Sequence, residues 1–293
     1  MNPFDNDQPV SSVSASVAGG DPLAQTLARV RMVMVRTSHP GNIGSAARAM
    51  KTMGLTDLCL VEPDHFPHEE ATWLASGATD VLARATVVSD LPAAVDDSVI
   101  VIGASARQRR IPTPQLDPRD CARLISDAPP GQRVSILFGR EASGLDNDAL
   151  DLCHYHLCVP ANPDYGVLNV AMAIQVVAYE IRQAFLKQLV LKQLVLKQEG
   201  EMAIATERQK AARMPLTAVD WDVPLASQAD TERFLAHLNE TLIEIGFINP
   251  DSPRQAMRRF RRLFQRIHMD EMEVNLLRGI LTAVNKQTSV KEE

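Results

Sequence analysis

The residues best suited to chemistry lie in a segment from Ser38 to Lys51, which reads SHPGNIGSAARAMK. Gly41 and Gly44 permit close approach of another backbone, and Asn42 can cap a helix that begins there. The free N–H groups of such a helix bind anions, and Arg48 follows one to two turns later, within reach of a phosphate. Taken alone, the segment is better explained as an ordinary turn from a strand into a helix with a solvated arginine.

The glycine spacing in this segment argues against two common nucleotide sites. It matches neither the G-x-G-x-x-G fingerprint of dinucleotide-binding proteins nor the Walker A motif, whose spacing is dictated by phosphate geometry. An oxidoreductase with a degenerate phosphate loop is therefore a minor alternative, and it predicts binding of a nicotinamide cofactor.

Two later segments have the same form, an apolar run followed by a loop that contains glycine. Leu137–Leu145 reads LFGREASGL and places Arg140 and Glu141 where a buried ion pair or a ligand contact is possible. Val159–Ala173 reads VPANPDYGVLNVAMA and carries Asn169 in the first turn of a helix of small residues. An amide among apolar residues costs stability unless it is hydrogen-bonded, so we expect Asn169 to have a partner, such as the main chain of a neighbouring loop.

A run of cysteines and histidines, Cys153–Cys158 (CHYHLC), is the one candidate metal site. It lacks the usual C-x₂-C spacing of zinc ligands. Strand alternation also places its two histidines on one face, with Tyr155 and Leu157 on the other. We therefore expect a structural strand and no metal, and no convincing Ser/His/Asp triad accompanies it.

The scaffold around these segments is predicted to be α/β. The expected strands are Val30–Val35, Asp57–Val61, Thr86–Val88, Val99–Gly103, Val134–Phe138 and His156–Val159. The expected helices are Ile43–Met53, Glu69–Ala75, Pro118–Ile125, Asp146–Leu152 and a long helix from Val167. Such alternation predicts a mostly parallel sheet. Its ligands should bind beyond the carboxyl ends of the strands, in loops 36–42, 103–112, 139–145 and 160–168.

Composition narrows the class of protein. The 293 residues are 45% hydrophobic and carry a net charge of −6, which excludes a disordered chain and a histone-like polycation. Four cysteines without a dense framework indicate reduced thiols. Residues 1–28 do not resemble a signal peptide, and no apolar run approaches the roughly 20 residues that a membrane helix needs. We expect a cytoplasmic protein without a membrane partner.

The chain divides into four predicted parts. Residues 1–28 are expected to form a flexible tail, 29–184 the α/β domain, 185–230 a helical extension and linker, and 231–293 a small all-α domain. The extension contains the repeat LKQLV, whose period of five does not maintain a coiled-coil seam. The long helix from Val167 carries apolar residues on several faces, more than a single core needs, which favours a dimer.

One helix of the last part is strongly basic. Its arginines are Arg254, Arg258, Arg259, Arg261, Arg262 and Arg266, with no acidic residue between the first and the last. Phe260 and Phe264 are expected to pack inward while the arginines face RNA phosphates. The alternative is an amphipathic helix with a merely solvated basic face.

In this order and spacing, the three glycine-bearing segments resemble the SPOUT class of S-adenosylmethionine-dependent RNA methyltransferases, and within it the TrmJ group. The similarity runs from Val30 to Arg182 and includes the run Gly103–Arg107. The resemblance implies a deep trefoil knot and a homodimer with active sites at the subunit interface. It also implies 2′-O-methylation of a tRNA pyrimidine ribose, at the residue that opens the anticodon loop (position 32).

The resemblance also assigns roles to residues. The cofactor-binding residues it implies are Ala104, Ser105, Ala106, Gly139, Val159, Gly166, Val167 and Leu168. Arg48 would engage the target phosphate and help to remove the hydroxyl proton, while Asn42, Glu141 and Asn169 would hold that arginine and the loops.

The chain departs from the family pattern at one point. The third motif often reads Ser-Ser-Leu-Asn in the family, whereas this chain has Gly166-Val167-Leu168-Asn169. A serine hydroxyl is therefore absent there, which leaves more of the proton transfer to Arg48, although arginine's high pKa makes it a poor base. The alternative function is a non-catalytic, knotted RNA-binding or assembly protein.

Overall fold

The apolar strands of the chain assemble into one parallel sheet of seven strands. The computed structural model describes residues 21–105, 113–198, 223–251 and 255–289. The strands are β1 (Val30–Val35), β2 (Asp57–Val61), β3 (Thr86–Val88), β4 (Ser98–Ala104), β5 (Gln115–Leu116), β6 (Arg133–Phe138) and β7 (Tyr155–Leu157). Their order is β3-β2-β1-β6-β4-β7-β5, and every neighbouring pair is parallel. The carboxyl ends of all the strands therefore meet at one edge of the sheet.

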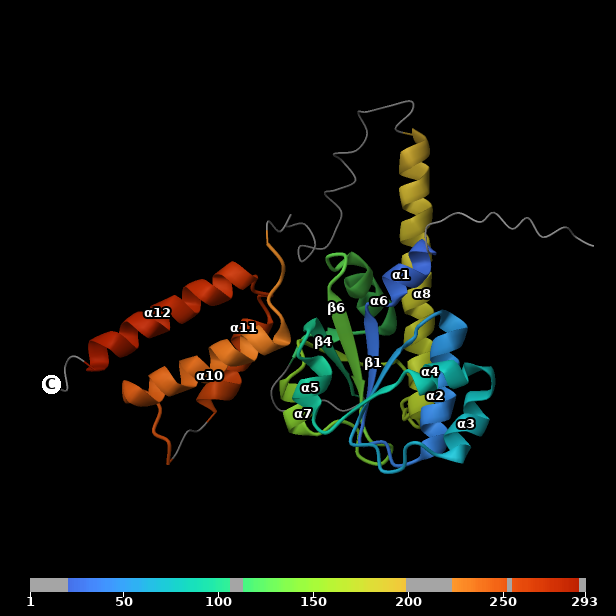
Figure 1. Ribbon diagram of the computed structural model, residues 1–293, viewed down its shortest axis with the longest axis horizontal. Coiled ribbons are helices and arrows are strands. Elements are labelled where there is room, and N and C mark those ends of the chain that lie inside the picture. The colour runs from blue at the N-terminus through green and yellow to red at the C-terminus, as the bar shows by residue number, and fades with distance from the viewer. Residues whose placement is uncertain (1–20, 106–112, 199–222, 252–254, 290–293) are drawn as a thin grey trace, which may run out of the picture.

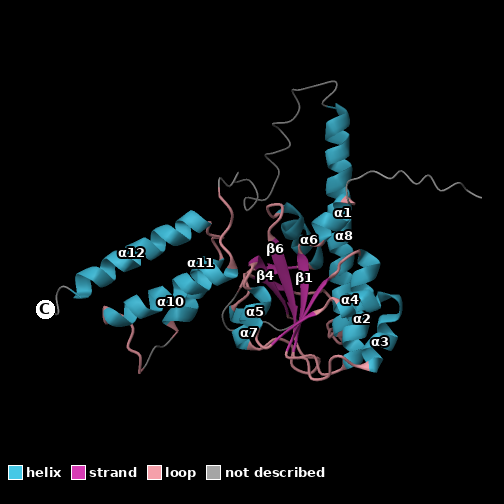
Figure 2. Cartoon of the chain, in the orientation of Figure 1, coloured by secondary structure: helices cyan, strands magenta, loops and turns pink. Residues whose placement is uncertain are grey.

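Helices cover both faces of this sheet (Figures 1 and 2). One face packs against α1 (Pro22–Leu27), α2 (Pro40–Met53), α3 (Glu69–Ala75), the 3₁₀ turn Ser76–Ala78, α4 (Thr79–Ala83), α6 (Pro118–Asp127) and α8 (Val170–Gln198). The other face packs against α5 (Leu91–Val95) and α7 (Asn147–Asp151). Strand β1 shows the alternation that this requires, since Met32 and Met34 belong to the first core while Val33 belongs to the second. Elements α1 to α8 form the sheet domain.

The α/β class and the mostly parallel sheet are confirmed, and β1, β2, β3 and α3 have the predicted bounds. The structure adds the short elements β5, α4 and α5, which the sequence pattern did not reveal. It also shortens the predicted tail, because Asp21 caps α1 and the side chains of Leu23 and Leu27 are buried. Residues 1–20 lie outside the described part of the chain. The trefoil knot stays a prediction.

The long helix α8 corrects one argument for a dimer. The apolar residues that exceeded the needs of one core include Ile174, Val177, Ala178 and Ile181, all fully buried within this chain. They pack on α2, α6 and the sheet, so none of them is free to meet a partner. The predicted helical extension is present as far as Gln198, and the rest of the predicted linker, residues 199–222, lies outside the described residues.

A small helical domain follows and docks on the sheet domain. Its helices are α10 (Gln228–Glu244), α11 (Ala256–Gln265) and α12 (Glu271–Ser289), which we call the C-terminal domain. Its core is small and centres on Phe234, Leu235 and Leu238. Contacts with the sheet domain include an ion pair between Arg258 and Asp151 and a backbone hydrogen bond from Ala229 N to Asp96 O. Within the described ranges, no helix combines the length and apolar character that a membrane crossing requires.

Candidate active site

A cavity of about 220 Å³ opens at the carboxyl edge of the sheet, beyond β4, β6 and β7. Its lining includes seven of the eight predicted cofactor residues: Ala104, Ser105, Gly139, Val159, Gly166, Val167 and Leu168. The eighth, Ala106, lies outside the described residues. Three separate loops therefore converge on one pocket, at the place where α/β sheets bind their ligands.

Gly139 makes the tight fold of the second loop possible. A Cβ built on Gly139 would overlap the backbone of Gly144 and Leu145. The loop closes by a hydrogen bond of 2.7 Å from Gly144 N to Arg140 O, and Gly144 adopts a positive φ of 69°. Gly139 is required because the backbone of Gly144 and Leu145 approaches it closely, and Gly144 is required because its φ is positive.

Glu141 is a lining residue of the pocket, and its carboxylate ties two loops together. Its Oε1 accepts a hydrogen bond from Asn42 Nδ2 at 2.7 Å, and its Oε2 accepts one from Ser38 Oγ at 2.8 Å. The backbone N–H groups of Ser38 and His39 donate to the same carboxylate at 3.2 and 3.3 Å. The loop before α2 is thereby fixed to the loop after β6.

Asn169 joins the third loop to this network. Its Nδ2 donates to Asn42 Oδ1 at 2.9 Å, and its Oδ1 accepts from Ala171 N at 2.9 Å, at the start of α8. The expectation that Asn169 has a partner is confirmed, although the partner across the loops is a side chain and not main chain. Asn42 thus donates to Glu141 and accepts from Asn169, which links all three segments.

The network keeps Glu141 ionised. Partial burial raises the pKa of Glu141, but the hydrogen bonds from Asn42, from its own backbone and from Ser38 outweigh burial and lower the pKa to about 2. Glu141 therefore carries a negative charge at neutral pH, next to the 38–42 loop.

Ser38 is a member of this network that the sequence interpretation did not single out. It lies in the first motif, directly before His39 and Pro40, but its role depends on Glu141, which is 103 residues away. The one signal in the sequence was its place in loop 36–42, one of the loops expected to bind ligand.

Arg48 does not join these residues. It lies on α2 with its side chain exposed, and no hydrogen bond or ion pair is found for it within the described ranges. One turn later, Thr52 Oγ1 donates to Gln175 Oε1 of α8 at 3.5 Å, so Arg48 lies along the seam of these two helices. The structure brings Asn42, Glu141 and Asn169 together but shows no contact from them to Arg48.

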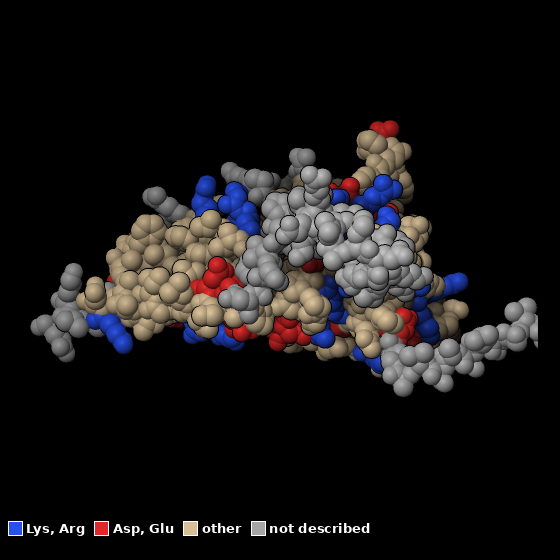
Figure 3. Space-filling view, turned by 90° about the horizontal axis from the view of Figure 1, so that it is seen from above, with Lys and Arg blue, Asp and Glu red and all other residues tan. Residues whose placement is uncertain are grey.

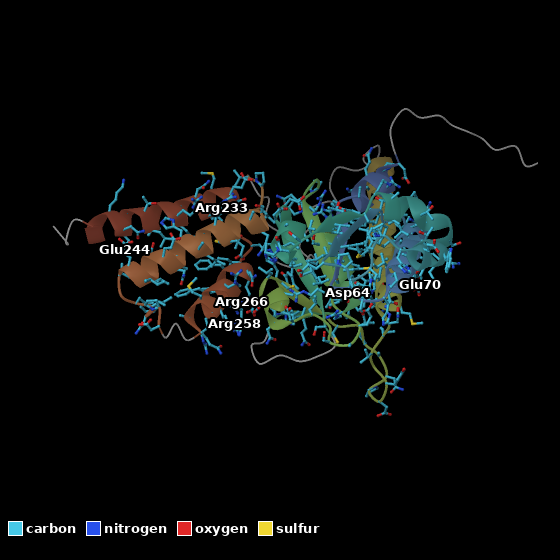
Figure 4. All side chains as sticks on the ribbon, turned by 60° about the horizontal axis from the view of Figure 1, so that its bottom comes forward. Asp64, Glu70, Arg233, Glu244, Arg258 and Arg266 are labelled. Carbon is cyan, nitrogen blue, oxygen red and sulfur yellow. The ribbon has the colours of Figure 1, made fainter. Side chains whose placement is uncertain are left out.

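The predicted RNA-binding arginines of α11 fall into two groups. Arg258 and Arg261 pair with Asp151 of the sheet domain and with Glu232 of α10. Arg259 and Arg266 are exposed, and Arg262 is half-buried in a cavity between the domains. Figure 4 shows Arg258 and Arg266 on α11 where this helix adjoins the sheet domain. Arg254 lies outside the described residues.

The aromatic side chains of α11 pack as predicted. Phe260 and Phe264 contact the core of the C-terminal domain. The Phe264 ring meets Phe234 edge to face, with 4.7 Å between the ring centroids. Because these rings face the core, the arginines of α11 lie at the surface and at the boundary with the sheet domain.

The cysteine and histidine run has a structural role. His154 and His156 are buried, and His154 Nδ1 accepts a hydrogen bond from Val101 N at 3.0 Å. The His154 ring stacks on His268 of the C-terminal domain, with centroids 5.4 Å apart. The described residues contain no cluster of three or more side chains of the types that commonly hold a metal ion.

Two family models match the chain. The model described as the SpoU rRNA Methylase family matches residues 29–179, just over half of the chain. The model described as tRNA methyltransferase TrmJ, C-terminal domain, matches residues 229–293.

Similar proteins and structures agree with these models. The tRNA (cytidine/uridine/adenosine-2'-O-)-methyltransferase TrmJ of Pseudomonas aeruginosa is 44% identical over 261 residues, which cover 89% of this chain and 95% of the relative. The tRNA (cytidine/uridine-2'-O-)-methyltransferase TrmJ of Salmonella choleraesuis is 44% identical over 265 residues, or 90% and 100%. The crystal structure of TrmJ from Z. mobilis ZM4 matches with a TM-score of 0.69 at 30% identity, over 87% of this chain and 98% of that one. The chain therefore belongs to the SpoU methylase family, in the group of TrmJ tRNA methyltransferases.

Proposed function

We propose that this protein transfers a methyl group from S-adenosylmethionine to the ribose 2′-hydroxyl of a tRNA pyrimidine, at position 32. The observation that carries the proposal is the chain of hydrogen bonds from Glu141 through Asn42 to Asn169. It joins the three motif loops, and the second and third of them line the pocket. Family membership supports the reaction class, because the similar curated proteins are named as tRNA 2′-O-methyltransferases.

The pocket fits the proposed cofactor. Gly139 lets the 139–145 loop fold tightly, and Val159, Val167 and Leu168 provide an apolar lining. Glu141 is a lining residue and is ionised, which suits a pocket proposed to take a cationic ligand. When bound, S-adenosylmethionine would supply a methyl group already activated by its sulfonium, so much of the protein's task is to orient the two reactants.

Arg48 is proposed to act at a neighbouring subunit's pocket. Exposed apolar side chains, Met172 and Tyr179, lie one turn on either side of Gln175, beside the seam that Arg48 borders. We propose that this face forms the homodimer interface. Such an interface would bring Arg48 to a pocket from which it is separate within one chain. There Arg48 would bind a phosphate of the RNA. Arg48 and that phosphate would together accept the proton of the target ribose 2′-hydroxyl.

The C-terminal domain is proposed to bind the tRNA. Arg259, Arg262 and Arg266 are the arginines of α11 for which no ion pair is found among the described residues. On the face in Figure 3, basic and acidic side chains are both present. Affinity for RNA would therefore depend on local groups such as this helix and not on overall charge.

Mass spectrometry of nucleosides tests the reaction. The full-length protein is incubated with S-adenosylmethionine and unmodified tRNA, and a 2′-O-methylated cytidine or uridine at position 32 is expected. A purely RNA-binding or assembly protein would leave the tRNA unmodified and would show no S-adenosylmethionine binding in calorimetry. We further propose a cytoplasmic location, where tRNA is present.

A further inference from the structure

A second cavity, of about 230 Å³, lies between the sheet domain and the C-terminal domain, and we call it the interdomain cavity. One wall is formed by Thr113, which precedes β5, and by residues of α7 and β7 such as Asn147 and His156. The other wall is a face of α11. Apart from Leu150 and Cys153, every described residue of the lining is polar or charged. The cavity therefore suits a ligand with charge and hydrogen-bonding atoms better than an apolar one.

Helix α11 directs its basic face into this cavity. The lining residues within the helix follow one another at intervals of three and four positions: Arg258, Arg261, Arg262 and Gln265. At 100° per residue, positions with this spacing share one face of a helix. Phe260 and Phe264 lie on the opposite face and contact the core of the C-terminal domain. Figure 4 shows Arg258 on α11 beside the sheet domain. Three arginines are thus turned toward the other domain, although arginine side chains are mostly exposed in folded proteins.

The interdomain cavity contains one positive charge that no carboxylate neutralises. Arg258 pairs with Asp151 at 2.5 Å, and Arg261 pairs with Glu232 of α10. Arg262 forms no ion pair within the described part of the chain, and Asp151 is the one acidic residue among the described residues of the lining. A guanidinium presents its N–H donors as a planar fork that matches two oxygens of a phosphate. Partial enclosure strengthens that attraction, because less water screens it than at an open surface.

We propose that the interdomain cavity binds one phosphate group, with Arg262 as its charged ligand and Thr113 as a neutral donor from the other wall. A phosphodiester carries one negative charge, which equals the unpaired positive charge of the cavity. The tRNA backbone is one source of such a group and free phosphate is the other. The tRNA source rests on the proposed function, whereas the phosphate site itself does not. Because both domains supply the walls, a bound phosphate would stabilise the docking of the C-terminal domain.

Thermal unfolding with inorganic phosphate as the probe tests the site without any enzymatic activity. The melting temperature of the full-length protein should be about 3 °C higher in phosphate, at ten times its dissociation constant, than in chloride of equal ionic strength. Arg262→Gln should respond at least threefold less. Arg278→Gln is the matched control, since it removes the same charge from an exposed position of α12 and should respond like the wild type. Phosphate also strengthens burial in general, but that effect is common to all three proteins. Equal responses in the two variants would overturn the proposal.

A charge placed on the sheet-domain wall tests whether the phosphate lies between the two domains. Thr113→Glu adds a carboxylate to the cavity that contains Arg262, so it should abolish the response to phosphate. Thr113→Gln adds a side chain of the same size without charge and should retain most of the response. A damaged fold cannot produce this difference between two variants at one position. If both variants respond like the wild type, the phosphate does not bind between the walls and the proposal fails.

The affinity for tRNA, measured against salt, separates the two sources of phosphate. If a backbone phosphate occupies the cavity, Arg262→Gln should flatten the log-log slope by about one unit, and Arg278→Gln should leave it unchanged. An unchanged slope in Arg262→Gln, together with a lost response to inorganic phosphate, would assign the cavity to free phosphate. A protein that responds to phosphate but leaves tRNA unmethylated would overturn the proposed function and retain the site. A protein that methylates tRNA but shows no phosphate response and no change of slope in Arg262→Gln would do the reverse.

Discussion

The hydroxyl of Tyr155 and the Nε2 atom of His268 lie 2.8 Å apart and join the sheet domain to the C-terminal domain. The His268 ring also stacks on both Tyr155 and His154. With the ion pair between Arg258 and Asp151, this contact holds α11 beside β7 and α7. The placement of the basic helix therefore depends on two buried histidines.

Domain docking should weaken in mild acid. Burial lowers the pKa of His268 to about 4. Burial, and then the charge of His268, lower the pKa of His154 to about 3 against the hydrogen bond from Val101. Both rings favour the neutral form when docked, so docking is most stable above pH 6.5 and loses stability as the pH falls from 6.5 toward 4. Small-angle scattering of the wild-type protein should show expansion over that range.

His268→Phe is the control for this effect. Phenylalanine keeps a ring against His154 but cannot be protonated, and it leaves Tyr155 without its partner. The variant should be more extended at pH 7.5 and should change less with pH than the wild type. An identical pH dependence in the two proteins would show that another group controls docking.

Glu141→Gln should weaken the pocket and make the stability of the fold less dependent on acid pH. A neutral amide presents one acceptor and one donor group to four donors, so the three loops lose part of their connection. We expect S-adenosylmethionine to bind about tenfold more weakly, the effect of losing one charge-assisted hydrogen bond. Calorimetry measures this affinity.

The acid stability of the same variant provides an independent check. The lowered pKa of Glu141 in the folded state stabilises the wild type above pH 4.5, and this stabilisation is lost as the pH falls from 4.5 toward 2. In Glu141→Gln the melting temperature should fall less steeply over that window. Glu240→Gln, at an exposed glutamate of α10, should retain the wild-type profile.

Gly139→Ala should disturb the pocket through the backbone. The added Cβ would overlap Gly144 and Leu145, so the loop must shift. Overpacking of this kind typically costs about 1–3 kcal/mol, and we expect a lower melting temperature together with weaker cofactor binding. Gly77→Ala is the matched control, because a Cβ there meets no atom within 4 Å. Equal cofactor affinity in the two variants would contradict the proposed site.

The main elements of the sheet domain were predictable because their pattern is local. Asp57–Val61, for example, is a short run of mostly apolar residues between Gly54 and Pro63, and those signals fix its position. Elements such as β5 and α5 have two and five residues, too few to show periodicity. The tail was misjudged at α1, although Asp21, Pro22 and the pair Leu23 and Leu27 are a readable helix start with an apolar face.

The candidate site was predictable in its loops, the family resemblance supplied its residues, and the contacts between them were not predictable. Strand topology places loops from distant segments at one edge, so those loops could be grouped before any distance was known. Which arginines of α11 form ion pairs could not be inferred in the same way. Arg258 is paired with Asp151, 107 residues away, and nothing in the sequence near Arg258 reveals that partner.

Separate variants should distinguish chemistry from RNA binding. Arg48→Ala should abolish methyl transfer while leaving cofactor affinity nearly unchanged, because Arg48 does not contact the pocket network of its own chain. Arg259→Ala/Arg266→Ala should raise the apparent KM for tRNA and leave kcat nearly unchanged, since those arginines would hold substrate and transition state alike.

Salt dependence determines whether the exposed arginines touch phosphate. The log-log slope of tRNA affinity against salt should flatten by about one unit for each phosphate that Arg259→Ala/Arg266→Ala can no longer bind. Arg258→Ala is a poor probe of RNA binding, because it breaks the pair with Asp151 and loosens domain docking. If the double variant retains the wild-type slope and KM, the exposed face of α11 is only solvated, and the tRNA must bind elsewhere on the protein.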